Sequence, residues 1–254
     1  SYLLTLAALG FMSWVSAEWL LALADGSVET AEILTAGTQP PFAINLRMGL
    51  AEAALTLIIN LTGLLSALVL RERLLQLGRR AMAVLLVATM AFCGIVLTRD
   101  IFNLFVFFEL AAIATAGLIL FSADGRALAA GFKYLIASQV VSVLLLVGII
   151  FAYHGAASLN IDGLAAAGLP LLPAGGIAFF LMFMALVVEL KPFPANGWAL
   201  DIYESAHPAF SAIFSAAGSA AALYAVDKLL LVGGPGWLPA ATGIGIVTFV
   251  AANV

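Results

Sequence analysis

The sequence predicts an all-α, polytopic transmembrane helical bundle, and three observations support this fold class. The 254 residues are 64% hydrophobic and only 9% charged, whereas an ordinary soluble domain is about a quarter charged. The mean hydropathy is +1.16. Finally, apolar stretches follow one another along the chain, each near the roughly 20 residues that an α-helix needs to cross a bilayer. Lipid is therefore the solvent expected around most of this chain.

Seven apolar segments can be delimited, and an eighth begins near Trp237. Their expected bounds are 2–23, 44–70, 81–97, 101–121, 128–153, 175–190 and 208–232. The eighth segment is still apolar where the sequence stops, and the sequence starts at Ser1 without a methionine or a charged leader. We expect residues 1–254 to form a single transmembrane domain that is a piece of a longer protein.

Four arginines predict the orientation of the bundle. The short linker between the second and third segments contains Arg71, Arg73, Arg79 and Arg80. Loops rich in arginine and lysine stay on the cytoplasmic side of a membrane. We therefore expect this linker to be cytoplasmic, which places the connection at 155–173 on the outer side.

Composition excludes several classes of function. Cys93 is the single cysteine, so the chain cannot form a disulfide framework or bind an iron–sulfur cluster by itself. The two histidines, His154 and His207, lie far apart without cysteines or carboxylates at metal-ligand spacing. The net charge of −4 gives no basic surface for nucleic acid. We expect no cofactor and no metal in this chain, and any redox chemistry to occur in a partner.

Glu109 is a carboxylate near the middle of the fourth apolar segment, in the stretch IFNLFVFFELAAI. An ionised carboxylate at this depth is costly unless it is paired, hydrated or protonated. Its neighbours one helical turn away are apolar, so a partner must come from another helix. A neutral, hydrogen-bonded interhelical acid is the structural alternative, and a proton relay is the functional interpretation that we favour.

Lys133 lies about two turns into the fifth segment, in AAGFKYLIASQ. It could extend its amine to the cytoplasmic surface, or it could be buried and act as a proton carrier. Ser138, Gln139 and Ser142 continue a polar face from it. This face slightly favours a hydrated interior.

The stretch ELKPFPANGWALDIYESAHP, residues 189–208, predicts a broken helix. Pro192 and Pro194 must interrupt any helix there, and a broken backbone at membrane depth is typical of ion sites in transporters. Glu189, Lys191, Asp201, Glu204 and His207 gather around this break. Solvated loop charges would explain Asp201 and Glu204 well, but they fit Glu189 and Lys191 less well.

Taken together, these segments resemble the antiporter-like, proton-conducting subunits shared by respiratory complex I, membrane-bound hydrogenases and Mrp-type cation/proton antiporters. The resemblance is carried by FVFFEL at 105–110, FKYL at 132–135 with LLLVG at 144–148, and the stretch 194–211 with its WALDIY and AHPAFS motifs. It implies a fold of about fourteen helices in inverted repeats, of which about eight are present here, with a first repeat at about 81–232. It also implies a prokaryotic inner membrane.

In that family a fifth-helix glutamate works with a lysine in the broken seventh helix and with further lysines along a hydrated line. Glu109 matches the glutamate, and Lys133 matches the sixth-helix lysine. The seventh-helix lysine position holds Glu189 here, with Lys191 two residues later. The resemblance therefore implies a proton path through Glu109, Lys133, Glu189 and Lys191.

The eighth-helix lysine position of the family falls near Ser219 and Ala220, and Asp227 and Lys228 lie two turns further on. Asp201, His207, Asp227 and Lys228 are accordingly accessory candidates. These departures from the pattern leave open whether the path is rerouted or lost.

Three functions remain open at this point. The first is a proton-translocating subunit of a redox-driven pump or cation/proton antiporter complex, with other membrane subunits as partners and sodium as an alternative ion. The second is a structural subunit that keeps the fold and assembles with such a complex without pumping. The third is an unrelated secondary transporter, which would also use broken helices.

Overall fold

A computed structural model describes residues 1–35, 37–38, 43–121 and 125–253 of the chain. Within these residues, seven helical stretches are long and apolar enough to cross a membrane, and α8 is a shorter apolar helix. The predicted transmembrane helical bundle is confirmed. The elements, in chain order, are α1 (Tyr2–Ala24), β1 (Ala31–Leu34), β2 (Asn45–Met48), α2 (Leu50–Val69), α3 (Arg71–Leu77), α4 (Arg79–Leu97), α5 (Ile101–Leu120), α6 (Gly125–Ala156), α7 (Ile161–Ala166), α8 (Gly175–Glu189), α9 (Gly197–Ser205), α10 (Pro208–Ala212), α11 (Ser219–Gly233) and α12 (Leu238–Ala252).

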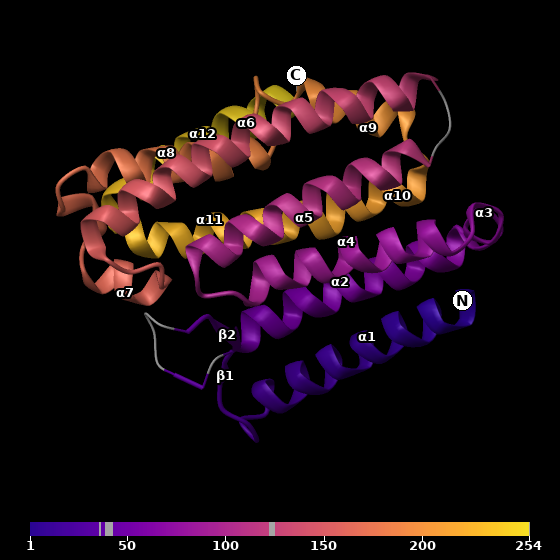
Figure 1. The fold of residues 1–254 in the computed structure, drawn as a ribbon, viewed down its shortest axis with the longest axis horizontal. Helices are drawn as coiled ribbons and strands as arrows, with labels where there is room; N and C mark the ends of the chain where they lie inside the picture. Colours follow the sequence, from indigo (N-terminus) through magenta and orange to yellow (C-terminus); the bar gives the residue numbers. More distant parts are fainter. Residues whose placement is uncertain (36, 39–42, 122–124, 254) are drawn as a thin grey trace.

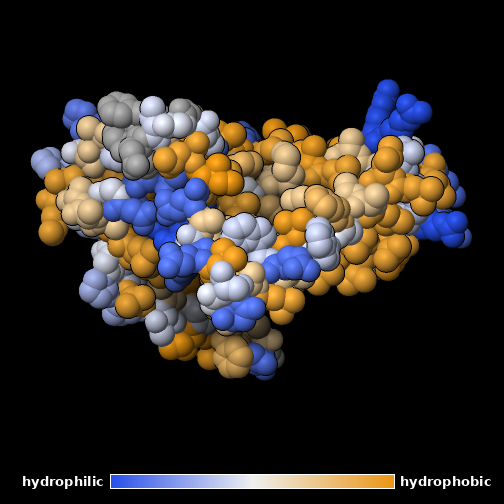
Figure 2. All heavy atoms as spheres, turned by 90° about the horizontal axis from the view of Figure 1, so that it is seen from below, coloured by the Kyte–Doolittle hydropathy of each residue, from blue (hydrophilic) through white to orange (hydrophobic). Residues whose placement is uncertain are grey.

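The long helices lie roughly parallel to one another, so the bundle has two distinct ends (Figure 1). One end, which we call the hairpin end, contains β1, β2 and α7. The opposite end, the linker end, contains α3 and the N-terminus. Figure 2 shows hydrophobic residues over much of one face, hydrophilic residues at the right end, and a hydrophilic patch that reaches from the left part into the lower centre. The wide hydrophobic areas are those expected of a bundle surrounded by lipid.

The hairpin corrects one predicted boundary. The second apolar segment was expected to be helical from Ile44, but residues Asn45–Met48 form β2, which pairs antiparallel with β1, and α2 begins only at Leu50. Isolated bridges join Leu46 to Thr98 and Asp100 to Asn160. The hairpin thus holds the α4–α5 corner and the segment before α7 together. Strand pairing of this kind depends on distant partners, which periodicity along the sequence does not reveal.

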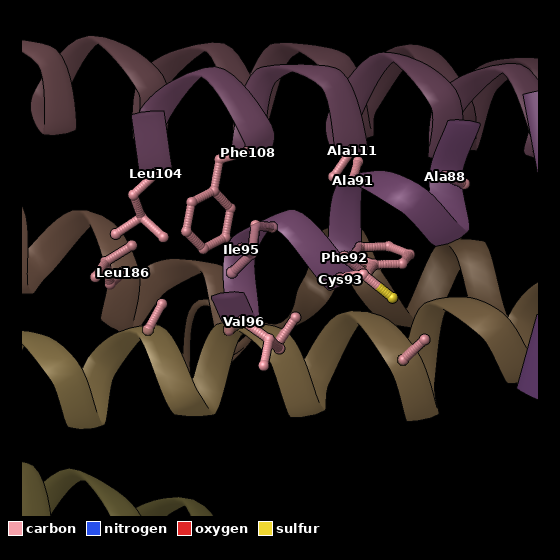
Figure 3. Packing of buried hydrophobic residues seen from close by; sticks show 14 of the residues in the cluster. Ala88, Ala91, Phe92, Cys93, Ile95, Val96, Leu104, Phe108, Ala111 and Leu186 are labelled. Carbon is pink, nitrogen blue, oxygen red and sulfur yellow. The ribbon is translucent and has the colours of Figure 1, made fainter. Parts of the chain in front are cut away.

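Small residues let the helices approach closely. At Gly148 of α6, a Cβ atom would lie 2.6 Å from the side chain of Met182 and 2.9 Å from the backbone oxygen of Ala178, both in α8. Figure 3 shows Leu104 and Phe108 of α5 pointing towards α4, where Ile95 lies opposite them. Close packing through small residues is the usual basis of helix association in membranes, because lipid removes the hydrophobic drive between helices.

The predicted break after α8 is present, and the short length of α8 is consistent with a break inside the hydrocarbon core. α8 ends at Glu189, and the backbone of Lys191 has a positive φ of 58°. The 15 residues of α8 span about 22 Å at 1.5 Å per residue, which is less than the roughly 30 Å of a hydrocarbon core. The chain then resumes as α9, so α8 and α9 together make one interrupted span.

The next span is also irregular. Between α10 and α11, residues Ile213–Gly218 form a π-helical turn, η2. π-helical turns are rare and frequently occur at functional sites. Phe214 belongs to this turn, and Ser219 follows it directly.

Candidate functional site

Lys191 occupies the centre of the candidate site, directly after the end of α8. Its side chain is 9% exposed, and its amine lies 3.4 Å from the hydroxyl oxygen of Ser219, to which it donates a hydrogen bond. The amine also lies 4.1 Å from the centre of the Phe214 ring. Both partners belong to the span formed by α10, η2 and α11, which we call the irregular span. Phe214 lies in η2, and Ser219 lies at the start of α11. This burial agrees with the sequence analysis, in which a solvated loop charge fitted Lys191 poorly.

The left-handed backbone at Lys191 is unusual for a residue with a side chain. Such a conformation costs about 1–2 kcal/mol relative to the usual regions. It persists only where the surrounding structure enforces it, and residues of this kind cluster at functional sites. The backbone strain at Lys191 therefore supports a functional role for the buried amine.

Glu189 and Tyr134 connect Lys191 with the neighbouring helices. Glu189 is half-buried, and its carboxylate interacts electrostatically with Lys191. The Tyr134 side chain is 2% exposed, forms a hydrogen bond with the side chain of Thr115 and interacts electrostatically with both Glu189 and Glu109. Its ring packs at 5.5 Å from that of Phe214. A buried tyrosine is therefore coupled electrostatically to both carboxylates, a relation that the sequence did not indicate.

Glu109 lies on α5 and is half-buried. Its carboxylate accepts a hydrogen bond from the side-chain amide of Gln139 on α6, at 3.3 Å. The partner thus comes from another helix, as expected from the apolar neighbours of Glu109, and it is an amide instead of a basic group.

Lys133 is not buried within this chain, in contrast to the hydrated interior that its polar face slightly favoured. Its side chain is 61% exposed, and the amine lies 2.6 Å from a carboxylate oxygen of Asp201 on α9. Asp201 is therefore paired, whereas the sequence favoured a solvated loop charge. The shared face arises because α6 and α9 pack against each other through Tyr134 and Trp198, whose ring centres are 5.5 Å apart.

Two further residues near the linker end, Glu204 and the accessory candidate His207, have mainly local roles. Glu204 is exposed and lies 4.0 Å from Arg126. His207 precedes α10 and accepts a hydrogen bond from the backbone N–H of Ala209 at its Nδ1 atom, so it caps this helix. Burial, and next the charge of Arg73, lower the pKa of His207 below its ordinary value. The imidazole is therefore neutral at pH 7, which suits its role as a hydrogen-bond acceptor.

Lys228 is buried but fixed. Its side chain is 1% exposed, and its amine donates hydrogen bonds to the backbone oxygens of Ile95, Val96 and Thr98 at 2.7, 2.9 and 2.8 Å. These oxygens lie at the C-terminal end of α4, where carbonyl groups lack partners within the helix and a positive charge is stabilising. Asp227, its neighbour in sequence, is exposed and lines a cavity of about 840 Å³.

The hairpin end contains further buried polar residues that sequence reasoning missed. Arg99 is 3% exposed and forms an ion pair with Asp162 of α7. Glu52, in the first turn of α2, is 3% exposed and accepts a hydrogen bond from the hydroxyl of Tyr224 at 2.6 Å. Glu52 was overlooked because it lies near the start of an apolar segment, where a carboxylate is usually solvated. Because the apolar segment was expected to begin at residue 44, a carboxylate at position 52 already lay inside it. This position could have identified Glu52 as a buried charge.

Similarity to known proteins agrees with this arrangement. Residues 98–254 match the family described as NADH:quinone oxidoreductase/Mrp antiporter, TM. NADH-quinone oxidoreductase subunit N of Desulforudis audaxviator is 30% identical over 234 residues, which cover 85% of this chain and 46% of that protein. A subunit of the Na(+)/H(+) antiporter of Bacillus subtilis is 32% identical over 138 residues, covering 54% of this chain and 28% of the relative. The chain thus spans half or less of the length of these curated relatives.

Solved structures share the fold. A chain of the membrane-bound sulfane sulfur reductase, an archaeal respiratory membrane complex, superposes with a TM-score of 0.82 at 27% identity, covering 95% of this chain and 50% of that chain. A chain of the Mrp complex from Dietzia sp. DQ12-45-1b superposes with a TM-score of 0.81 at 24% identity, covering 91% and 43%. Because the family match covers more than half of the sequence, the chain belongs to the NADH:quinone oxidoreductase/Mrp antiporter transmembrane family.

Proposed function

We propose that this chain forms the proton-translocating part of a membrane subunit in a redox-driven pump or a cation/proton antiporter complex. The observation that carries the proposal is the amine of Lys191, which is buried at the break after α8 and, among the described residues, is held by one hydrogen bond of 3.4 Å. A lysine in such a place can change its protonation state readily, because burial weakens its hold on the proton and few partners oppose the change.

The proposed path runs from Glu109 through Tyr134 to Glu189 and Lys191. Tyr134 interacts with both carboxylates, so its hydroxyl can take part in proton exchange between them. Glu189 interacts electrostatically with Lys191, which completes the proposed connection. In this proposal Lys133 and Asp201 supply protons to Glu109 from the exposed face of α6 and α9. Lys228 is left out of the path because three carbonyl groups hold its charge in place.

Partner subunits are expected to cover this exposed face. Lys133, Asp201 and Gln139 all lie at the surface of the chain, next to apolar side chains of α6. Charged groups at membrane depth face protein or water in preference to lipid. The names of the relatives, which describe subunits of NADH-quinone oxidoreductase and of a sodium/proton antiporter, support a multi-subunit assembly.

The proposed location is a prokaryotic inner membrane, with the linker end on the cytoplasmic side. The arginines of α3 and the start of α4 support this orientation through the positive-inside rule. Labelling a cysteine introduced at Gln76 with a membrane-impermeant reagent tests it. Modification in inside-out vesicles only is expected, and modification in intact cells would reverse the orientation.

The central test replaces Lys191 in the intact assembly. Lys191→Met removes the titrating group, and Lys191→Arg keeps a positive charge that does not release its proton. We expect proton uptake by vesicles to fall about tenfold or more in both variants, in the range of a lost acid–base group. Glu18→Gln, at an exposed position on α1, is the matched control and should leave uptake unchanged. Full uptake in Lys191→Arg would remove Lys191 from the path and favour the structural, non-pumping alternative.

Glu109→Gln tests the other end of the path. The amide keeps the shape and the hydrogen bond to Gln139, but it does not exchange a proton. Assembly should survive, and proton uptake should fall by about tenfold or more. Unchanged uptake would contradict a relay role for Glu109, and loss of assembly alone would identify it as a packing element.

A further inference from the structure

The irregular span carries polar contacts at successive levels of the bundle. Ser219, at the start of α11, accepts the hydrogen bond from Lys191. Tyr224, five residues later and about 7.5 Å further along the helix axis, donates to Glu52. Lys228 follows one turn beyond, at the hairpin end. α11 therefore connects the helix break with the hairpin end through polar side chains.

Both carboxylate oxygens of Glu52 are hydrogen-bonded. Oε1 accepts the Tyr224 hydroxyl at 2.6 Å, and Oε2 accepts the backbone N–H of Gly49 at 3.1 Å. A Cβ atom at position 49 would lie only 2.9 Å from Oε2, so glycine is what permits this approach. Bonds from a hydroxyl and from a helix N-terminus stabilise an ionised carboxylate. Glu52 is thus a buried carboxylate in direct hydrogen-bond contact with the Tyr224 hydroxyl.

Tyr224 links this buried carboxylate to a cavity. It is half-buried and lines the 840 Å³ cavity, together with Leu190 and Pro192, which flank Lys191 in sequence. Asp227 lines the same cavity and is exposed to it, which offers a polar partner to entering water. The cavity therefore borders the surroundings of both Lys191 and Tyr224.

We propose that Glu52 and Tyr224 form a second proton-transfer site, between Lys191 and the hairpin end. This inference rests on the proposed function of Lys191. The Lys191 ammonium gives one proton to an adjacent water molecule and becomes neutral, and water carries the proton past Leu190 and Pro192 into the cavity. Water gives a proton to the Tyr224 oxygen as the Tyr224 hydroxyl passes its own proton to Glu52, which becomes a neutral acid. Glu52 then releases that proton at the hairpin end and is ionised again.

The neighbouring fixed charges favour this last step. Lys228 interacts electrostatically with Glu52, and its amine lies 5.2 Å from the centre of the Tyr224 ring. Since Lys228 is held by three carbonyl groups, its amine stays in place beside Glu52. A fixed positive charge stabilises the ionised carboxylate and so promotes release of the proton. Lys228 acts here as a positioning residue.

The test compares four variants in the intact assembly, reconstituted in vesicles. Glu52→Gln removes the proton acceptor, and Tyr224→Phe removes only the hydroxyl. The matched controls are Glu18→Gln and Tyr153→Phe, both at exposed positions. We expect proton uptake to fall about tenfold or more in Glu52→Gln and Tyr224→Phe, with assembly intact and the controls unchanged. Infrared difference spectra recorded on energising the native assembly should contain a protonated-carboxyl band that Glu52→Gln removes.

The outcomes separate this inference from the proposed function. Normal uptake in Glu52→Gln, with uptake lost in Lys191→Met, would overturn the second site and leave the role of Lys191 standing. Normal uptake in Glu52→Gln, Tyr224→Phe and Lys191→Met alike would overturn both the second site and the proposed function of Lys191. Loss of uptake in Tyr224→Phe alone would show that the hydroxyl serves structure and not transfer, and would also overturn the site. If Glu52→Gln fails to assemble, two other measurements test the second site. Normal uptake by Tyr224→Phe would overturn it, and so would the absence of a protonated-carboxyl band from the native assembly.

Discussion

The chain buries two lysines near the two ends of α11, Lys191 beside Ser219 and Lys228 in the helix itself, and their surroundings differ sharply. Lys228 donates three hydrogen bonds of 2.7–2.9 Å to carbonyl groups at the end of α4. Lys191 donates one hydrogen bond of 3.4 Å and lies over an aromatic ring. Short, numerous bonds to a cation stabilise its charge, whereas a long single bond resists deprotonation weakly. Burial alone therefore does not separate the structural role assigned to Lys228 from the transport role proposed for Lys191, and we expect the number of hydrogen-bond partners to separate them.

The comparison predicts its largest effect on stability at Lys228. Lys228→Met leaves buried carbonyl groups without partners and should lower the free energy of unfolding by about 3 kcal/mol. Lys191→Met should change it by about 1 kcal/mol or less. Thermal unfolding of the solubilised assembly, followed by size-exclusion chromatography, measures both. Leu231→Met, at an exposed position of α11, is the control. Equal losses in the two lysine variants would remove the distinction between them.

An intermediate effect is expected at Asp162, which pairs with the buried Arg99. Asp162→Asn removes the anion and leaves Arg99 close to Lys228, whose charge interacts with it. Because Asp162 is itself 53% exposed, water replaces part of the lost interaction. We expect a loss of about 2 kcal/mol in the same unfolding measurement. A loss comparable to that of a surface substitution would mean that the hairpin end is less rigid than its contacts indicate.

The smallest effect is expected for the pair of Lys133 and Asp201. Their side chains are 61% and 40% exposed, so solvent screens the interaction in the solubilised chain. A double-mutant cycle with Lys133→Met and Asp201→Asn should give a coupling of about 0.5 kcal/mol. A coupling several times larger in the complete assembly would indicate that a partner subunit covers this face, and an unchanged value would argue against that cover.

Much of the fold could be predicted from the sequence, because each long apolar segment specifies a helix in lipid. The spans were placed to within a few residues, and the break after α8 followed from Pro192 and Pro194. The hairpin of β1 and β2 could not be predicted in this way. Its strands are four residues long, and they depend on pairing with each other and with Thr98.

The site was predictable to a lesser degree. Glu109, Lys133, Glu189 and Lys191 were found because charge is unusual in an apolar segment. Tyr134 and Tyr224 were missed because tyrosine is unremarkable in such segments, and only the tertiary arrangement places their hydroxyl groups beside carboxylates. Asp201 was interpreted as a loop charge because its partner, Lys133, is 68 residues away in sequence. The roles assigned to all these residues remain predictions.

The π-helical turn between α10 and α11 determines the directions in which the side chains of α11 point around the helix axis. Such a turn holds one residue more than an α-helical turn, and each residue advances the helix by about 100°. Ser219, Tyr224 and Lys228 therefore face α8, α2 and α4 only because residues 213–218 contain that additional residue. A sequence one residue shorter here could keep every side chain of α11 and yet turn all three away from their partners. The additional residue changes neither the composition nor the hydropathy noticeably, but it determines which helices the side chains of α11 face.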